Sequence, residues 1–277
     1  MSRFVYLLSE GVHDVAFLSR VLTQLRGASK VNARSRLDEP RQRWVDGFKW
    51  PVREDIGRLA VPAPTFLLLP TGDTLIGLRN SQGIDQLAAT LEDDLEVLYK
   101  LDALPDAIGV FLDSDQESQA ARFAGLRAKL LKIAVGHHLL EVADELACLA
   151  TGEPRVGVFA FPRPGAEGTL EDLLLDLGRI PYQDLCAAAS TYVAARCEGV
   201  LDDPHRDWRG LRAQSGVTKA TFAAATAILK PGRGSVATIE DNRWVGDETH
   251  QHPSLSPCLE FLDRVLAPPG PEGGAHS

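Results

Sequence analysis

The sequence predicts an α/β fold in which a parallel sheet is flanked by helices and followed by a helical carboxyl-terminal elaboration. Short apolar runs alternate with helix-like patterns through the first two-thirds of the chain, which is typical of a parallel sheet with helical crossovers. Each run is apolar along its whole length, as expected for strands that are covered on both faces. The final third shows mostly helical patterns. Strands are expected at residues 4–9, 65–69, 107–112 and 156–161.

Helices are expected after each strand and through the final third. The first runs from about Asp14 to Leu25, because Val15, Leu18 and Leu22 fall on one stripe of a helix. The remaining helices are expected at 83–101, at 121–133, within 139–149, from about 170, and at 182–198, 217–229 and 256–266.

Two segments lack a regular pattern. Residues 26–64 are rich in Arg, Pro and Trp and are predicted to be an insertion, whereas the Pro/Gly-rich residues 267–277 are predicted to be disordered. The expected organisation is therefore an α/β domain over 1–180, a helical subdomain over 181–266 packed on it, and a disordered tail.

The composition is that of an ordinary globular chain, with 44% apolar and 24% charged residues in 277. No apolar run approaches the ~20 residues that span a bilayer, and we expect a cytoplasmic protein that does not contact a membrane. The net charge of −9 argues against a surface that coats nucleic acid as a whole. Residues 205–233 nevertheless carry six Lys/Arg against one acid. The four scattered cysteines form no CxxC pair, which disfavours a zinc site.

Carboxylates follow two of the expected strands. Glu10 and Asp14 come after the first, and Asp113 and Asp115 after a later one. Because the carboxyl ends of parallel strands share one edge of a sheet, these groups are expected to lie together. Several carboxylates in one place repel each other unless a cation neutralises them, and oxygen-only ligands favour Mg²⁺ or Mn²⁺ over zinc.

These motifs resemble the Toprim domain, the catalytic module of topoisomerases, bacterial-type primases and overcoming-lysogenization-defect (OLD) nucleases. The resemblance is carried by Glu-Gly-x-x-Asp at residues 10–14 and Asp-x-Asp at 113–115, and in order and pattern it covers residues 3–175. The chain also resembles stand-alone bacterial Toprim-like proteins of unknown function, in which the fourth strand leads to Gly-x-Leu-Glu-Asp, here residues 168–172.

The resemblance implies a Rossmann-like fold and a Mg²⁺-dependent phosphotransfer enzyme acting on DNA or RNA, in particular a nuclease. It implies that Glu10 is the general acid/base and a metal ligand, with Asp14 as its companion, and that Asp113 and Asp115 hold the metal. Glu171 and Asp172 are candidate outer ligands. The chain shows no P-loop, topoisomerase-type tyrosine domain or primase zinc module. It also lacks the ATPase domain of OLD nucleases, which leaves a separately encoded ATPase as a candidate partner.

Each of these residues also has a structural alternative. Asp14, Asp115 and the 171–172 pair lie where helices begin, and acids there commonly cap free N–H groups. Lys219 and Arg233 are candidate phosphate-binding residues, since Lys219 lies at an expected helix start and Arg233 in a basic glycine loop; a solvated helix lysine is the alternative. The histidines, including His13, lack a set of partners with ligand spacing and are expected at the surface.

Three other functions are alternatives to the nuclease hypothesis. A noncatalytic Toprim-like module that binds nucleic acid or protein would bind without turnover. A haloacid-dehalogenase-type phosphohydrolase would place its Asp-x-Asp after the first strand, which is not the pattern here. An Asp-x-Asp glycosyltransferase would leave Glu10 and Gly11 without a role.

Overall fold

A six-stranded sheet forms the centre of the computed structural model, which describes residues 2–48, 64–114 and 118–268. Its strand order is β2-β3-β4-β1-β5-β8. Four consecutive strands are parallel: β4 (Thr74–Asn80), β1 (Arg3–Ser9), β5 (Ala107–Asp113) and β8 (Arg155–Phe161). The other two are antiparallel to their neighbours: β3 (Thr65–Leu68) and β2 (Ser29–Lys30).

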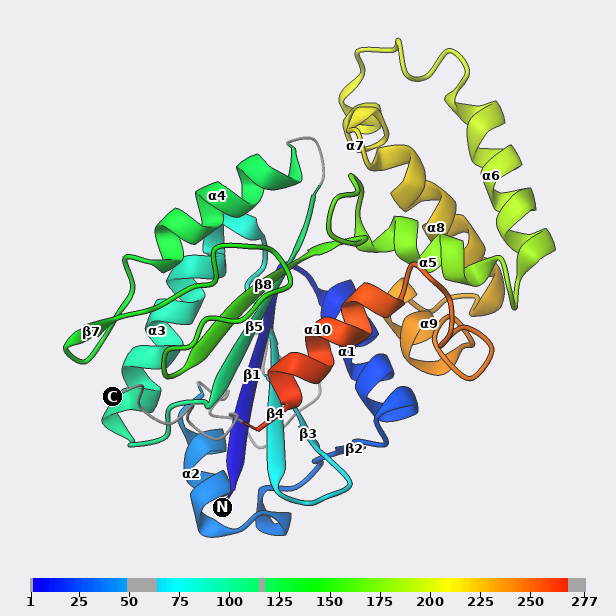
Figure 1. Ribbon diagram of the computed structural model, residues 1–277. Coiled ribbons are helices and arrows are strands. Elements are labelled where there is room, and N and C mark those ends of the chain that lie inside the picture. Colours follow the sequence, from blue (N-terminus) through cyan, green and yellow to red (C-terminus); the bar gives the residue numbers. More distant parts are fainter. Residues whose placement is uncertain (1, 49–63, 115–117, 269–277) are drawn as a thin grey trace.

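Helices cover both faces of the sheet (Figure 1). On one face, Tyr6 and Leu8 of β1 pack in a cluster with buried side chains of the helices α2 (Glu39–Asp46), α3 (Leu87–Lys100) and α4 (Gln119–Leu130). On the other face, Val5 and Leu7 pack in a second cluster with α1 (Val12–Leu25), α5 (Leu170–Gly178) and α10 (Ser256–Leu266). This alternation along β1 explains why the strand is apolar at successive positions.

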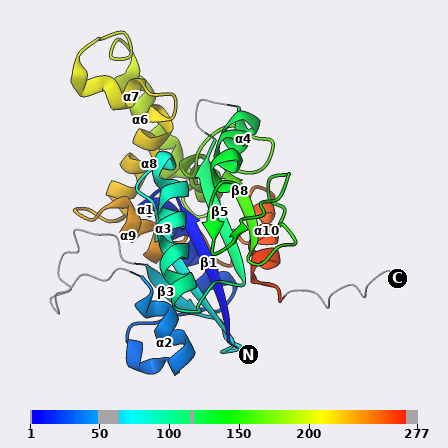
Figure 2. The same ribbon diagram turned by 90° about the vertical axis from the view of Figure 1, so that its left-hand side faces the viewer.

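The final third is helical, as the sequence predicts. It contains α6 (Gln183–Cys197), α7 (Arg209–Arg212), α8 (Gly216–Leu229), α9 (Ser235–Asp241) and α10. The tip formed by α7 and one end of α6 stands away from the sheet in both views (Figures 1 and 2). The chain then returns to the sheet, where the ring of Phe261 in α10 lies 5.5 Å from that of Phe111 and 5.6 Å from that of Phe159.

The α/β prediction is confirmed, and the structure differs from the expected elements in three places. β4 was not expected, and because it intervenes, β3 runs antiparallel rather than parallel. The insertion contains a short helix, α2, which Asp38 caps by accepting a hydrogen bond from the Arg41 N–H. The helix expected within 139–149 is wrong. That segment follows the hairpin of β6 (Ala134–Val135) and β7 (His138–Leu139) and runs along the edge of β8.

Single 3-10 turns complete the described secondary structure, at Arg34–Arg36, Ile84–Gln86 and Arg206–Trp208. The expected disorder of the tail falls almost wholly on residues 269–277, outside the described part of the chain. Within the described residues, no helix combines the length and apolar character needed to cross a bilayer.

Candidate metal centre

The first two acids lie at the turn between β1 and α1. Glu10 follows the last residue of β1, and Asp14 occupies the first turn of α1. The Asp14 carboxylate is buried, with 5% of the residue exposed, and its Oδ2 accepts a hydrogen bond of 2.8 Å from the Gly11 N–H. Asp14 therefore caps its own helix, as the structural alternative anticipated, while its charge lies at the sheet edge.

Asp113 ends the neighbouring strand and meets Glu10. Its N–H donates to Glu10 Oε2 over 3.5 Å, which places the two residues side by side at the carboxyl edge of the sheet. Its own Oδ1 accepts a 2.8 Å hydrogen bond from the N–H of Leu170, the first residue of α5. Asp113 thus links β5 to α5. The second aspartate of the motif, Asp115, lies outside the described residues.

Glu171 brings a further carboxylate to this edge from α5. Only 5% of the residue is exposed. Its Oε1 lies 2.9 Å from Nδ1 of His13, whereas its buried Oε2 has no hydrogen-bond partner among the residues that the structure describes. A buried polar atom without a hydrogen-bond partner lowers stability by about 1–3 kcal/mol. A ligand bound to this oxygen would remove that cost.

The pKa shifts show that these carboxylates interact. Burial, with the charges of Glu10 and Glu171, raises the pKa of Asp14 to about 7 against the opposing Gly11 hydrogen bond. Burial also holds the pKa of Asp113 well above its usual range, and the nearby charges of Asp14, Glu171 and Glu10 add to that effect. Four acids therefore share one partly desolvated region, in which the ionised forms are destabilised.

Glu171 behaves differently from its neighbours. Burial works to raise its pKa, but the hydrogen bond from His13 and the positive charge of Lys219 outweigh it, and the pKa is lowered. Glu171 is therefore an ionised carboxylate with one oxygen held by His13.

The donor set suits a hard divalent cation. All four groups offer carboxylate oxygens, the ligands that Mg²⁺ and Mn²⁺ prefer. Within the described residues, no three His, Cys, Asp or Glu side chains are already gathered as a metal site would require. Repulsion separates carboxylates that have no cation between them, and the Asp-x-Asp partner Asp115 lies outside the described part. The residues at this edge fit a cation in chemistry and burial, and its binding would require their side chains to draw together.

The other predicted site residues are Asp172, Lys219 and Arg233, and each has a different environment in the structure. Asp172 accepts hydrogen bonds from the Thr169 N–H (2.8 Å) and the Thr218 hydroxyl (3.1 Å), so both of its oxygens are occupied in holding α5 and α8. Lys219, in the first turn of α8, lies close enough to influence the pKa of Glu171. Arg233 lies past the opposite end of α8, where its charge acts on Asp241, and the structure does not bring it to the carboxylates.

Two residues near the carboxylates were missed as site residues from sequence. His13, expected at the surface, has a side chain only 33% exposed and pairs with Glu171. Its position within the 10–14 motif, three residues after Glu10, is the signal that could have identified it. The second residue is Arg122 of α4, which donates a 2.7 Å hydrogen bond to the backbone carbonyl of Asp113.

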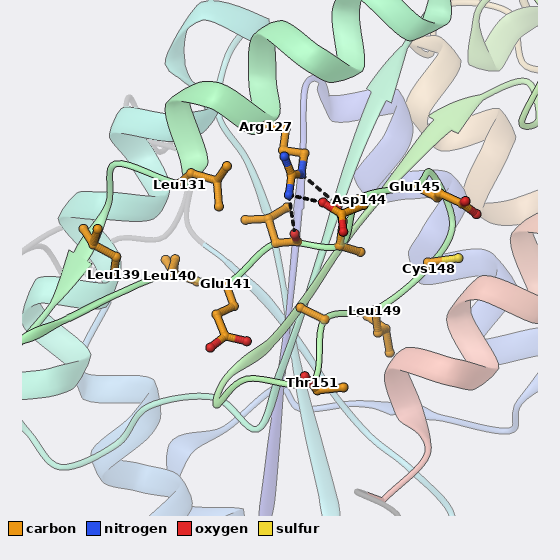
Figure 3. Close-up of a pocket in the computed structure, with 13 residues that line it drawn as sticks. Arg127, Leu131, Leu139, Leu140, Glu141, Asp144, Glu145, Cys148, Leu149 and Thr151 are labelled. Carbon is orange, nitrogen blue, oxygen red and sulfur yellow. Dashed lines mark hydrogen bonds and ion pairs between the residues drawn. The ribbon is translucent and has the colours of Figure 1, made fainter.

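A cavity of about 450 Å³ lies beside α5, and Glu10, Asp14, Asp113 and Glu171 are not among its lining residues. It lies between the loop after β8 and the helices α5 and α8, and its lining includes Asp172, Thr218, Arg163 and Arg179. A second cavity of about 790 Å³ lies elsewhere, between α4 and residues 139–151 (Figure 3). There Arg127 reaches across to Asp144, and none of the edge carboxylates lines the space.

Comparisons with known proteins identify a family and a similar structure, and neither is described with a reaction. The chain is similar to the crystal structure of hypothetical protein PH0156 from Pyrococcus horikoshii OT3, with 16% sequence identity, 95% of each chain covered and a TM-score of 0.49. No curated protein matches the chain. Residues 5–266 match the family described as "Protein of unknown function (DUF3226)", and the chain belongs to this family.

Proposed function

We propose that the protein is a Toprim-like, Mg²⁺-dependent phosphotransfer enzyme that acts on nucleic acid as a nuclease. The observation that carries this proposal is the convergence of Glu10, Asp14, Asp113 and Glu171, shown by their mutual effects on pKa, at the carboxyl edge of a parallel sheet. The unpartnered Oε2 of Glu171 supports it.

In this proposal Glu10, Asp113 and Asp115 hold the cation, and Glu171 contributes its free oxygen. When bound, a divalent cation neutralises charge on phosphoryl oxygens. Glu10, at the turn after β1, would accept the proton of the attacking water as the new O–P bond forms; the bond from phosphorus to the leaving sugar oxygen breaks, and that oxygen takes up a proton from solvent. Asp14 remains hydrogen-bonded to Gly11 and fixes the turn that carries Glu10.

Cations of the chain supply the contacts to the nucleic-acid backbone. Lys219 lies near Glu171 at the sheet edge and is suited to a phosphate next to the reacting one. Farther out, the projecting tip carries Arg206, whose side chain is 93% exposed, and the neighbouring Arg209. Arg233 is less suited, because it lies near Asp241 at the other end of α8.

Cleavage by the purified protein tests this proposal. Labelled single- and double-stranded DNA and RNA are incubated with the full chain and Mg²⁺ or Mn²⁺. We expect metal-dependent cleavage that Glu10→Gln lowers by at least ~100-fold, the usual size of an acid/base contribution. Asp113→Asn keeps the acceptor for the Leu170 N–H and removes the charge, so we expect it to abolish cleavage while preserving the fold.

Asp184→Asn is the matched control, since Asp184 is an exposed acid in the first turn of α6. If cleavage survives both Glu10→Gln and Asp113→Asn, these two residues do not form the active site of a nuclease.

A noncatalytic binding module is the second candidate. It is favoured by the finding that, in the described part of the chain, no three potential ligands are gathered as a metal site would require. This candidate predicts that the protein binds nucleic acid without cleaving it. Metal-dependent product formation by the wild-type protein, lost in Asp113→Asn, would exclude it.

A further inference from the structure

The pair of His13 and Glu171 joins two helices across the candidate metal centre. His13 lies in the first turn of α1 and Glu171 in the first turn of α5, 158 positions apart in the chain. Since an ionised carboxylate only accepts hydrogen bonds, the 2.9 Å contact is one in which the His13 Nδ1–H donates to Oε1. The imidazole is held edge-to-face against Phe222 of α8, with 6.1 Å between ring centroids.

The two oxygens of Glu171 are therefore in different situations. Oε1 is occupied by His13, and Oε2 is buried with no partner in the described part of the chain. The terminal torsion of a glutamate is soft, so a carboxylate without such a donor would rotate between orientations. A hydrogen bond to one oxygen fixes the carboxylate plane and hence the direction in which the other oxygen points.

We propose that His13 is a positioning residue for the metal centre: its Nδ1–H holds Oε1 of Glu171, so that Oε2 is kept in place for a divalent cation shared with the acids of β1 and β5. This inference rests on the proposed function, because it presupposes that the cation binds at this edge. His13 does not touch the cation itself. It acts as the outer hydrogen-bond partners of metal-binding carboxylates do, whose removal typically lowers metal affinity by roughly 10–100-fold.

The structural alternative is that His13 only fastens α1 to α5. Both helices already have other attachments: α1 packs in the same buried cluster as α5, and Asp113 holds the start of α5. A purely structural His13 would lower stability when replaced and leave cation affinity unchanged. The two roles therefore give different results in a binding experiment.

The experiment is a Mn²⁺ titration of the metal-stripped full chain at one fixed pH, followed by the electron paramagnetic resonance signal of free Mn²⁺. The variants are His13→Ala, His13→Asn and Glu171→Gln, with His138→Ala as control because His138 is an exposed residue of β7. The amide nitrogen of an asparagine stands close to where Nδ1 is in histidine, so His13→Asn restores the donor without the ring. Circular dichroism and thermal unfolding confirm that each variant is folded.

We expect His13→Ala to weaken Mn²⁺ binding by roughly 10–100-fold, His13→Asn to recover most of that loss, and His138→Ala to bind as the wild type does. If His13 acts through Glu171, the double variant His13→Ala/Glu171→Gln binds no more weakly than Glu171→Gln alone.

Two failures are distinguishable. Absence of Mn²⁺ binding by the wild-type protein would overturn the proposed metal centre itself. Wild-type binding that His13→Ala leaves unchanged, or that His13→Asn does not recover, would overturn the positioning role and leave the metal centre standing.

Discussion

Asp14 illustrates how one side chain serves both the fold and the candidate site. Its carboxylate caps the start of α1 through Gly11, and the same carboxylate lies among the charges of Glu10 and Glu171. The sequence allowed a capping role or a site role, and the structure shows the cap within reach of the site. Because the group is buried, holding it ionised destabilises the folded state when no cation is present.

The raised pKa of Asp14 predicts a pH dependence of stability. Its folded-state pKa is about 7, against 3.8 for a solvent-exposed aspartate such as that of the unfolded chain. The folded state therefore binds the proton more tightly, and the contribution of Asp14 to stability is full below about pH 4 and is lost as the pH rises to about 7 and beyond. We expect the free energy of unfolding in EDTA, from urea titrations, to fall across this window.

Asp14→Asn is the variant that isolates this effect, because its side-chain oxygen still accepts from Gly11 while carrying no titrating proton. Its free energy of unfolding should depend less on pH between 4 and 8 than that of the wild type. Identical slopes for the two proteins would contradict the assignment of the raised pKa to Asp14.

The meeting of Glu10 and Asp113 could be predicted from sequence, and the role of Glu171 only in part. β1 and β5 were both recognisable as buried parallel strands, and adjacent parallel strands bring their carboxyl ends together. The contact of His13 with Glu171 depends on how α5 docks against α1, which no local pattern encodes. The histidine was consequently expected at the surface.

At the scale of elements, the unexpected strand β4 lies inside the sheet, between β3 and β1. The run at 74–80 follows Pro70-Thr71-Gly72-Asp73, a turn signal that predicts a hairpin with β3, so the information for β4 was present in the sequence. Gly77, in the middle of β4, interrupts the run of larger apolar residues because the ring of Trp44 occupies the space beside it. A Cβ there would lie 2.7 Å from the ring of Trp44.

A helix was expected within residues 139–149, but this segment instead covers the edge of β8. The Ala147 N–H donates to the Val158 carbonyl over 2.7 Å, and Arg127 Nε holds the Ala143 carbonyl at 2.9 Å. Covering a free strand edge satisfies its polar groups and prevents pairing with another chain. These long-range bonds outweigh the local helical pattern, which is why the sequence alone was misleading.

This covering segment makes Gly157 of β8 sensitive to substitution. A Cβ on Gly157 would lie 2.2 Å from the backbone carbonyl oxygen of Cys148, and backbone atoms there cannot move without breaking the covering bonds. We expect Gly157→Ala to lower the free energy of unfolding by about 1–3 kcal/mol, as overpacking does. Urea unfolding measures this change.

Gly125→Ala is the control, because Gly125 lies within α4 and, among the described residues outside its own stretch of helix, no atom comes within 4 Å of the added carbon. It should raise stability by about 0.5–1 kcal/mol through helix propensity. An equal effect of the two substitutions would show that the segment does not press on β8.

At the scale of the whole molecule, α10, near the end of the described chain, packs on the central sheet beside β1. One buried cluster contains Val5 and Leu7 of β1 together with Phe261 and Val265 of α10. The side chain of Arg3 donates to the carbonyls of Leu266 (2.9 Å) and Ala267 (2.7 Å). A core that joins both ends of the chain predicts that the sheet and the helical elaboration unfold together.

Phe261→Ala tests this cooperation. The ring packs against two other phenylalanines of the sheet and is fully buried, so its removal is expected to cost about 3–5 kcal/mol. Unfolding followed by circular dichroism and by tryptophan fluorescence should show one coincident transition in both the wild type and the variant.

Ile228→Ala provides the comparison, since this residue of α8 is 64% exposed and its removal should change stability by less than about 0.5 kcal/mol. Separate transitions for the two probes would mean that the helical elaboration folds independently.

The proposed metal centre is tested most directly by a crystal structure of the full chain grown with MnCl₂, in which anomalous scattering locates the manganese. We expect a peak bound by oxygens of Glu10 and Asp113, with Oε2 of Glu171 facing it and His13 still on Oε1. Manganese bound only at other surfaces, with these carboxylates in contact with water alone, would contradict it.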